Sequence, residues 1–149
     1  MGEQYTLLFD QDFDLPSVVL RYFNVYGPRQ PESGAYALVL GIFLRRAADG
    51  QVLEIHGDGS QRRDFVHVRD VVAANIAALE SGVRGTVFNV GSGTSLSVKE
   101  LADMISPNQI HIEGRKGDSL ATLADISRIK AALGWTPKVS FADGLKELF

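Results

Sequence analysis

The sequence predicts an α/β fold, because short segments patterned like strands alternate with segments patterned like helices along the chain. Two observations carry this prediction. Runs rich in β-branched and aromatic residues alternate with apolar residues spaced by three or four, and glycines stand where several of the helical segments end. The chain has 149 residues, 45% of them hydrophobic, which is enough for one ordinary hydrophobic core.

The first predicted helix covers residues 2–15 and runs directly into a strand at residues 17–22. Its apolar residues at helical spacing are Tyr5, Leu8, Phe9 and Phe13. A helix that enters a strand with so little between them is typical of the middle of an α/β unit. We therefore expect that an N-terminal part of the fold is missing from this sequence.

A second helix and two short strands are predicted next. The apolar face of this helix consists of Tyr36, Leu40, Phe43, Leu44 and Ala47. Gly50 is expected to end it, because glycine readily adopts the left-handed conformation found after helices. Residues 52–57 alternate like a strand, a Gly-Asp-Gly turn follows, and residues 64–68 form the second strand.

The third predicted helix covers about residues 70–80 and is closed by Gly82. The residues expected to face inward are Val72, Ile76 and Leu79. A strand at residues 86–91 follows.

The capping box of Ser97 and Glu100 then predicts the start of a fourth helix. Its expected buried residues are Val98, Leu101, Ala102 and Ile105. Next come a strand at residues 110–114 and a short helix at residues 127–133, which Gly134 ends. The final amphipathic segment holds Leu145, Leu148 and Phe149.

The composition excludes several classes of protein. The formal net charge of -3 argues against a general nucleic-acid or membrane-surface binder, which usually carries a basic stripe. With no cysteine, the chain has no disulfides and no cysteine-based zinc site. No apolar stretch approaches the length of a membrane span, and no signal peptide is recognisable, so a cytoplasmic protein is expected.

Residues 89–97, a glycine-rich segment between a strand and a helix, are a candidate dinucleotide loop. However, Leu96 stands where the third glycine of the G-x-G-x-x-G pattern belongs, and no acidic residue follows at the usual distance. A tight turn is therefore favoured over a phosphate cradle. His56, His67 and His111 are too dispersed to favour a metal site, and no G-x-S-x-G nucleophile motif occurs.

The arginines are the more informative candidates. Arg62 and Arg63 lie just before one predicted strand, and Arg115 and Lys116 follow another. A guanidinium group matches the geometry of a phosphate, so two arginines from separate loops could clamp a diphosphate. Exposed loop arginines are also common as solvated charge, and their spacing alone does not decide between the two interpretations.

Four segments together resemble the NAD-dependent epimerase/dehydratase family, the extended short-chain dehydrogenase/reductases that act on nucleotide sugars. The segments are residues 18–30, 56–71, 88–102 and 115–145. They occur in the order of the family and cover nearly the whole chain. The resemblance is strongest to UDP-glucose 4-epimerase-like members.

This resemblance implies a two-part protein. In the family, an N-terminal Rossmann domain holds NAD and a Tyr-x-x-x-Lys pair, and a C-terminal domain binds the nucleotide sugar. This sequence has no G-x-x-G-x-x-G motif at its start, and no tyrosine is followed by lysine four residues later. The resemblance therefore implies a C-terminal fragment, with residues 1–30 a remnant of the Rossmann domain and residues 31–149 the nucleotide-sugar-binding domain. We expect this fragment to be inactive alone and not to bind NAD.

The resemblance also implies roles for particular residues. Asn24 matches a family position that meets the diphosphate, and Arg63 and Arg115 match the two diphosphate-binding arginines. Tyr22 and Phe23 match positions near the nicotinamide of NAD.

Leu38 and His56 match positions that contact the sugar and the nucleotide base, and Asp118 matches a loop-organising or ribose-side residue. Ala37 departs from the pattern, since some epimerases place a polar residue there, so the sugar and the reaction subtype stay open. A nucleotide-sugar 4,6-dehydratase fragment and a stand-alone, non-catalytic nucleotide-sugar-binding module are the alternatives. For the chain itself, the uncovered apolar residues of the first helix predict self-association.

Overall fold

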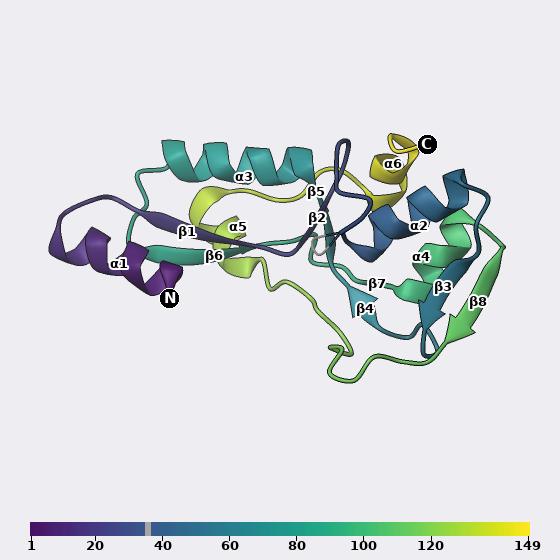
Figure 1. Ribbon diagram of the computed structural model, residues 1–149. Coiled ribbons are helices and arrows are strands. Elements are labelled where there is room, and N and C mark those ends of the chain that lie inside the picture. The colour runs from purple at the N-terminus through teal and green to yellow at the C-terminus, as the bar shows by residue number, and fades with distance from the viewer. Residues whose placement is uncertain (35–36) are drawn as a thin grey trace.

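The computed structural model describes residues 1–34 and 37–149 and confirms the α/β fold (Figure 1). The helices are α1 (Gly2–Asp12), α2 (Val39–Ala48), α3 (Val68–Glu80), α4 (Val98–Ile105), α5 (Ser127–Leu133) and α6 (Phe141–Lys146). The strands are β1 (Val18–Tyr22), β2 (Asn24–Tyr26), β3 (Leu53–His56), β4 (Arg62–Arg63), β5 (Phe65–His67), β6 (Thr86–Val90), β7 (Leu96–Ser97) and β8 (Gln109–Ile112). In Figure 1, α1, α3, α5, β1 and β6 form one end of an elongated molecule, and α2, α4, β3 and β8 form the other.

The strands form four pairs among the described residues. The pairs β1–β6, β2–β5 and β3–β8 are parallel, and β4–β7 is antiparallel. The chain changes partner between Phe23 and Asn24. The amide of Phe23 donates to the carbonyl oxygen of Val90 at 3.0 Å, whereas that of Asn24 donates to the carbonyl oxygen of Asp64 at 3.1 Å. One extended segment therefore joins the two ends of the molecule.

Two hydrophobic clusters support these ends. The first consists of Tyr26, Leu40, Phe43, Leu53, Ile55, Phe65, Leu101, Ala102 and Leu145. The second consists of Val66, Val71, Ala74, Phe88, Val90, Ile129 and Trp135, with Val18, Leu20 and Val25 packed against it. Each cluster draws residues from several distant parts of the chain. The division into residues 1–30 and 31–149 stays a prediction.

Local signals correctly predict several helix ends. Ser97 accepts a hydrogen bond from the amide of Glu100 at 3.0 Å, while the Glu100 carboxylate accepts from the amide of Ser97 at 2.7 Å. This is the predicted capping box. Gly134 ends α5 with a φ of 64°. Gly50, with a φ of 67°, directly follows Asp49, the C-cap residue of α2. Tyr36, expected on the α2 face, lies outside the described residues.

The predicted inner face of α3 is wrong. Val72, Ile76 and Leu79 are 53%, 49% and 87% exposed. The inward residues are instead Val71 and Ala74, which pack against the strands. The helix begins at Val68. Because Val71 and Val72 are adjacent and equally apolar, the sequence does not decide which of them faces the core. The small side chain of Ala74 fits the face that approaches the sheet.

The final amphipathic segment is only partly covered. Phe149 is 74% exposed, although Leu145 in α6 is buried as expected. The apolar residues Leu8, Phe9 and Phe13 are uncovered, as expected from the sequence, and α1 ends at Asp12 rather than at residue 15, so that Phe13 follows it. None of the helices in the described part of the chain is long and apolar enough to cross a membrane.

Candidate functional site

A hollow of about 410 Å³ lies between β2, the start of α2, β3 and β4. All six residues predicted to bind substrate line it, namely Asn24, Leu38, His56, Arg63, Arg115 and Asp118. Ala37 lines it as well. These residues come from separate segments of the chain, and only the fold brings them together. Their individual roles stay predictions.

Arg63 and Asn24 are held on the wall of this hollow by backbone carbonyl groups. Arg63 donates from Nη1 to the carbonyl oxygens of Ser119 and Arg62, at 2.8 and 2.9 Å. All hydrogen bonds from the Arg63 side chain to described residues come from Nη1. Asn24 donates from Nδ2 to the carbonyl oxygen of Asp64 at 2.9 Å. These hydrogen bonds orient both side chains where they line the hollow.

The neighbouring Arg62 has a different environment. Its Nε donates to Ser95 Oγ at 3.0 Å, its Nη2 donates to the Ser95 carbonyl oxygen at 2.6 Å, and its Nη1 lies 3.3 Å from Glu100 Oε2. Because successive side chains of a strand point to opposite faces, Arg62 supports β7 and α4 while Arg63 faces the hollow.

The loop that carries Arg115 and Asp118 is tethered beside β4. The amide of Arg62 donates to the carbonyl oxygen of Leu120 at 2.9 Å, and the amide of Thr122 donates to the carbonyl oxygen of Arg62 at 3.0 Å. Arg115 and Asp118 themselves are exposed. The loop is therefore anchored after Asp118, with its two charged side chains at the rim.

Sequence reasoning missed Arg46, Glu54 and Gln61, which also line the hollow. Arg46 Nη1 lies 2.9 Å from Glu54 Oε1, and this hydrogen bond lowers the pKa of Glu54. Alternation along β3 was the available signal, because Glu54 and His56 are two residues apart and share a face. Since Arg46 and Glu54 balance each other, the remaining positive charge belongs to Arg63 and Arg115, opposed by Asp118.

The glycine-rich segment does not act as an open phosphate cradle. The carboxylate of Asp64 accepts hydrogen bonds from the amides of Ser92 and Gly93, at 2.6 and 3.1 Å. These are the groups that a dinucleotide loop would offer to phosphate. Gly93 has a φ of 72°, which favours glycine, and the residues of this loop do not fit the pyrophosphate of NAD.

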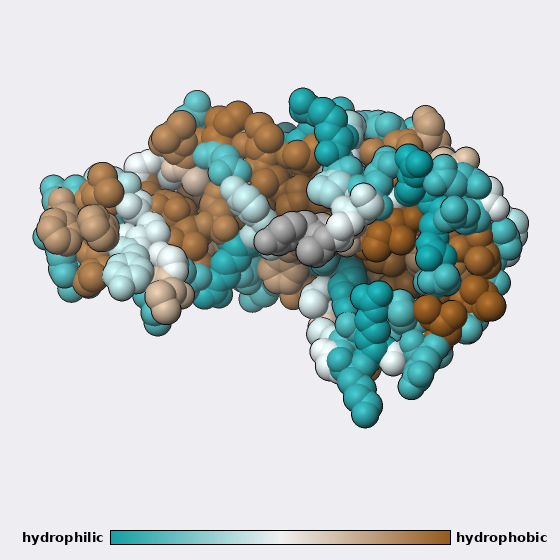
Figure 2. Space-filling model, viewed as in Figure 1, coloured by the Kyte–Doolittle hydropathy of each residue, from teal (hydrophilic) through white to brown (hydrophobic). Residues whose placement is uncertain are grey.

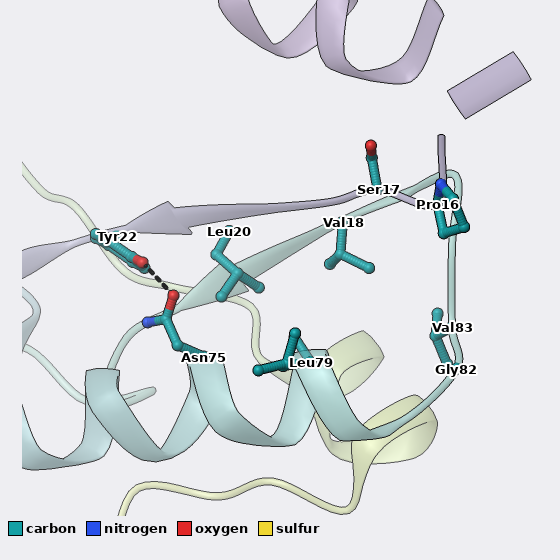
Figure 3. A pocket seen from close by; sticks show the side chains of 10 residues that line it. Pro16, Ser17, Val18, Leu20, Tyr22, Asn75, Leu79, Gly82 and Val83 are labelled. Carbon is teal, nitrogen blue, oxygen red and sulfur yellow. Dashed lines mark hydrogen bonds between the residues drawn. The ribbon is translucent and has the colours of Figure 1, made fainter. Parts of the chain in front are cut away.

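A second hollow, of about 480 Å³, lies between the edge of β1 and α3 (Figure 3). Tyr22 lines it and donates a hydrogen bond from its hydroxyl to Asn75 Oδ1 at 2.9 Å. Phe23 is absent from the described linings of both hollows. The structure therefore does not bring the two residues predicted to meet NAD into the first hollow.

The three histidines do not form one cluster, because His56 and His111 lie on the paired strands β3 and β8, whereas His67 ends β5. His67 is buried and accepts a hydrogen bond at Nδ1 from the amide of Arg69, at 3.3 Å. The Nδ1 atoms of His56 and His111 lie 3.1 and 2.8 Å from the carbonyl oxygens of Glu113 and Gly57. Across residues 1–34 and 37–149, no three metal-binding side chains gather.

Comparisons with known proteins agree with this architecture. Residues 1–91 match the family model described as the NAD dependent epimerase/dehydratase family. The chain is therefore a member of the NAD-dependent epimerase/dehydratase family.

Its relatives include both epimerases and 4,6-dehydratases. It is 36% identical to a putative UDP-glucose 4-epimerase of Methanocaldococcus jannaschii, over 99% of this chain and 49% of the relative. It is 34% identical to a dTDP-glucose 4,6-dehydratase of Streptomyces niveus, over 98% of this chain and 44% of the relative.

A solved structure is similar over nearly the whole chain. The UDP-glucose 4-epimerase of Thermotoga maritima, crystallised with UDP-glucose, superimposes with a TM-score of 0.91 at 39% identity. The match covers 98% of this chain and 48% of that structure. The chain thus spans about half the length of the relatives that it matches.

Proposed function

We propose that this chain forms the nucleotide-sugar-binding part of an NAD-dependent nucleotide-sugar epimerase of the UDP-glucose 4-epimerase type. The observation that supports this most is the single hollow that gathers all six predicted substrate-binding residues. In this proposal Arg63 and Arg115 hold the diphosphate together with Asn24. Leu38 contacts the sugar, His56 lies at the base, and Asp118 lies at the ribose.

The charge distribution of the hollow supports the position of the diphosphate. Arg46 is already paired with Glu54, whereas the Nε and Nη2 atoms of Arg63 make no hydrogen bond to the described residues. Two guanidinium groups can bind both phosphates of a nucleoside diphosphate, and each hydrogen bond is strengthened by charge. A single phosphate would engage only part of this arrangement.

Calorimetry on the chain tests the proposal, with UDP, UMP and uridine as ligands. UDP is expected to bind most tightly, and its affinity should fall as salt is added, because charged contacts are screened. UMP should bind more weakly and uridine most weakly. If uridine binds as tightly as UDP, the hollow holds no diphosphate.

The complete catalytic activity would require a second part. The glycine-rich loop of this chain is closed by Asp64, and its tyrosines lack the lysine partner, so we propose that NAD and the proton-transfer residues belong to another part of the protein. The proposed division is residues 1–30, continuing that part, and residues 31–149, binding the nucleotide sugar. A cytoplasmic location and a homo-oligomeric state belong to the same proposal.

A 4,6-dehydratase part is the second candidate, supported by the similarity to the Streptomyces niveus dehydratase. Joining the chain to the Rossmann part of a relative separates the two reactions. An epimerase product keeps the mass of its substrate, whereas a dehydratase product loses one water. Binding of UDP without either reaction in the joined protein would favour the non-catalytic binding module. Sequencing upstream of the Met1 codon offers an independent check.

A further inference from the structure

We propose that Asp64 is the positioning residue of the substrate hollow, acting through Asn24, Arg63 and the segment after Asp118 rather than by touching the ligand. The inference rests on the proposed function, since it assigns a task within the same site. Asp64 lies between β4 and β5 and has no exposed surface. It does not line the hollow itself.

The carboxylate of Asp64 joins two distant segments. Its Oδ1 accepts hydrogen bonds from the amide and the hydroxyl of Ser92, at 2.6 and 2.7 Å. Its Oδ2 accepts from the amides of Gly93 and Ala124, at 3.1 and 3.0 Å. Four donors surround one buried carboxylate, and three of them are backbone amides with fixed directions. Any shift of this group therefore moves the backbone of both segments.

The backbone of Asp64 meets a third segment, the one that carries Asn24. Its carbonyl oxygen accepts from the amide of Asn24 at 3.1 Å and from Asn24 Nδ2 at 2.9 Å. This is the point at which the extended segment leaves β6 and joins β5. The residue after β6 is Gly91, where a Cβ would lie 2.8 Å from Asp64 Oδ2 and 2.4 Å from Ala124 Cβ. The junction is thus closely packed around the carboxylate.

Two of the three segments held by Asp64 bear directly on the proposed diphosphate site. The first contributes Asn24. The second is residues 119–124, which follow the loop of Arg115 and Asp118. In this segment the carbonyl oxygen of Ser119 accepts the hydrogen bond from Arg63. Asp64 itself follows Arg63 in the chain. Asp64 therefore links these groups, since its backbone carbonyl holds Asn24, its carboxylate holds Ala124 beyond the Arg115 loop, and the residue itself follows Arg63 directly.

The chain offers a matched control in Asp70. This aspartate is 4% exposed and accepts hydrogen bonds from the amides of Lys138 and Val139, each at 3.0 Å. It performs the same kind of structural task but does not line the hollow and holds none of its residues. The variants Asp64→Asn and Asp70→Asn each replace one acceptor oxygen with an NH2 group, which cannot accept a hydrogen bond from the surrounding amides. Both are expected to destabilise the fold.

The test compares UDP binding and stability in the two variants of this chain, using calorimetry and denaturant unfolding. Asp64→Asn should weaken UDP binding about 10-fold, because misplaced binding groups lose most of their interaction, whereas Asp70→Asn should change it less than about twofold. In spectra recorded without ligand, the side-chain amide signals of Asn24 should shift in Asp64→Asn and not in Asp70→Asn. Equal UDP binding by both variants would overturn the proposal.

A milder variant keeps the test decisive if Asp64→Asn fails to fold. Ser92→Ala removes one hydrogen bond to the carboxylate and leaves the backbone intact, so UDP binding should weaken about threefold. Parent-like binding and parent-like Asn24 signals in Ser92→Ala would refute the positioning role. If the parent chain binds no UDP, the proposed function has failed, and the inference fails with it. That outcome is distinct from a parent that binds UDP while Asp64→Asn binds equally well.

Discussion

Arg63 donates a hydrogen bond from Nη1 to the carbonyl oxygen of Ser119 at 2.8 Å. This contact joins β4 to the segment that follows the loop of Arg115 and Asp118. The two arginines proposed to bind phosphate are thereby parts of one tethered unit, although 52 positions separate them in the sequence (115 minus 63). Their energetic contributions are the most direct quantity to measure.

Replacing Arg63 or Arg115 with alanine should weaken UDP binding by about 10- to 150-fold, since hydrogen bonds to charged groups are worth roughly 1.5–3 kcal/mol. Lysine should restore only part of the loss, because a point charge cannot reproduce the planar fork of guanidinium. Calorimetry measures both effects. Arg45→Ala is the control, since Arg45 pairs with Asp49 outside the described lining of the hollow. Parent-like affinity in both alanine variants would make these arginines surface charge.

The chain alone should not interconvert UDP-glucose and UDP-galactose. Proton transfer by the family depends on the Tyr-x-x-x-Lys pair and hydride transfer on bound NAD, and this sequence contains neither the pair nor an open dinucleotide loop. The assay follows UDP-galactose formation with and without added NAD. Turnover by the purified chain would show that the chemistry resides in these 149 residues.

The exposed face of α1 should cause self-association. Tyr5, Leu8, Phe9 and Phe13 are 43% to 67% exposed, and hydrophobic surface is visible at this end of the molecule and over α3 (Figure 2). The helix is instead held to its neighbours by polar contacts, including Arg84 Nε to Asp10 Oδ1 at 3.0 Å. Among the described strands β1 pairs only with β6, so its other edge offers a second surface for association.

Sedimentation over a range of concentrations measures this association. The double variant Leu8→Gln and Phe9→Gln should shift the distribution toward monomer, because it removes apolar area from the α1 face. Leu120→Gln is the control, since Leu120 is 80% exposed on a distant loop. A parent chain that remains monomeric at high concentration would contradict the prediction.

The stability of the fold should decrease as the pH falls below about 6.5, because of His67. Burial lowers the pKa of His67 from its ordinary value of 6.5, although Glu147, with Oε2 3.7 Å from Nε2, opposes the shift. In the unfolded chain this histidine takes up a proton near pH 6.5, while the folded state resists protonation until a lower pH. Unfolding therefore binds protons in this window, and acidification favours it. Nearby Tyr26 does not titrate there, since burial raises its pKa to about 12.

His67→Asn isolates this effect, because asparagine can still cap α3 but cannot take up the proton. Denaturant unfolding at about pH 7 and pH 5.5 should show a smaller loss of stability in the variant than in the parent. His111→Asn is the control, as His111 is exposed. An unchanged pH dependence in His67→Asn would mean that other groups carry the acid sensitivity.

The helix boundaries illustrate what local chemistry can predict. The Ser97–Glu100 capping box and Gly134 lie where the sequence places them, because each depends on hydrogen bonds or dihedral angles within about four residues. The inner face of α3 was not predictable in the same way. Val71 and Val72 suit a core equally well, and only the packing of α3 on the sheet selects Val71.

The sequence by itself determined the α/β class, the family and, through family motifs, six residues of the proposed site. It did not distinguish Arg62 from Arg63 by charge or spacing. That distinction follows from the pairing of β4 with β7, which turns one guanidinium toward Ser95 and the other toward the hollow. Asp64 could not be predicted as a site residue, because the partners of its four carboxylate hydrogen bonds lie 28 to 60 positions away in the sequence. Contacts of that range exist only once the tertiary structure has brought separate backbones together around one buried charge.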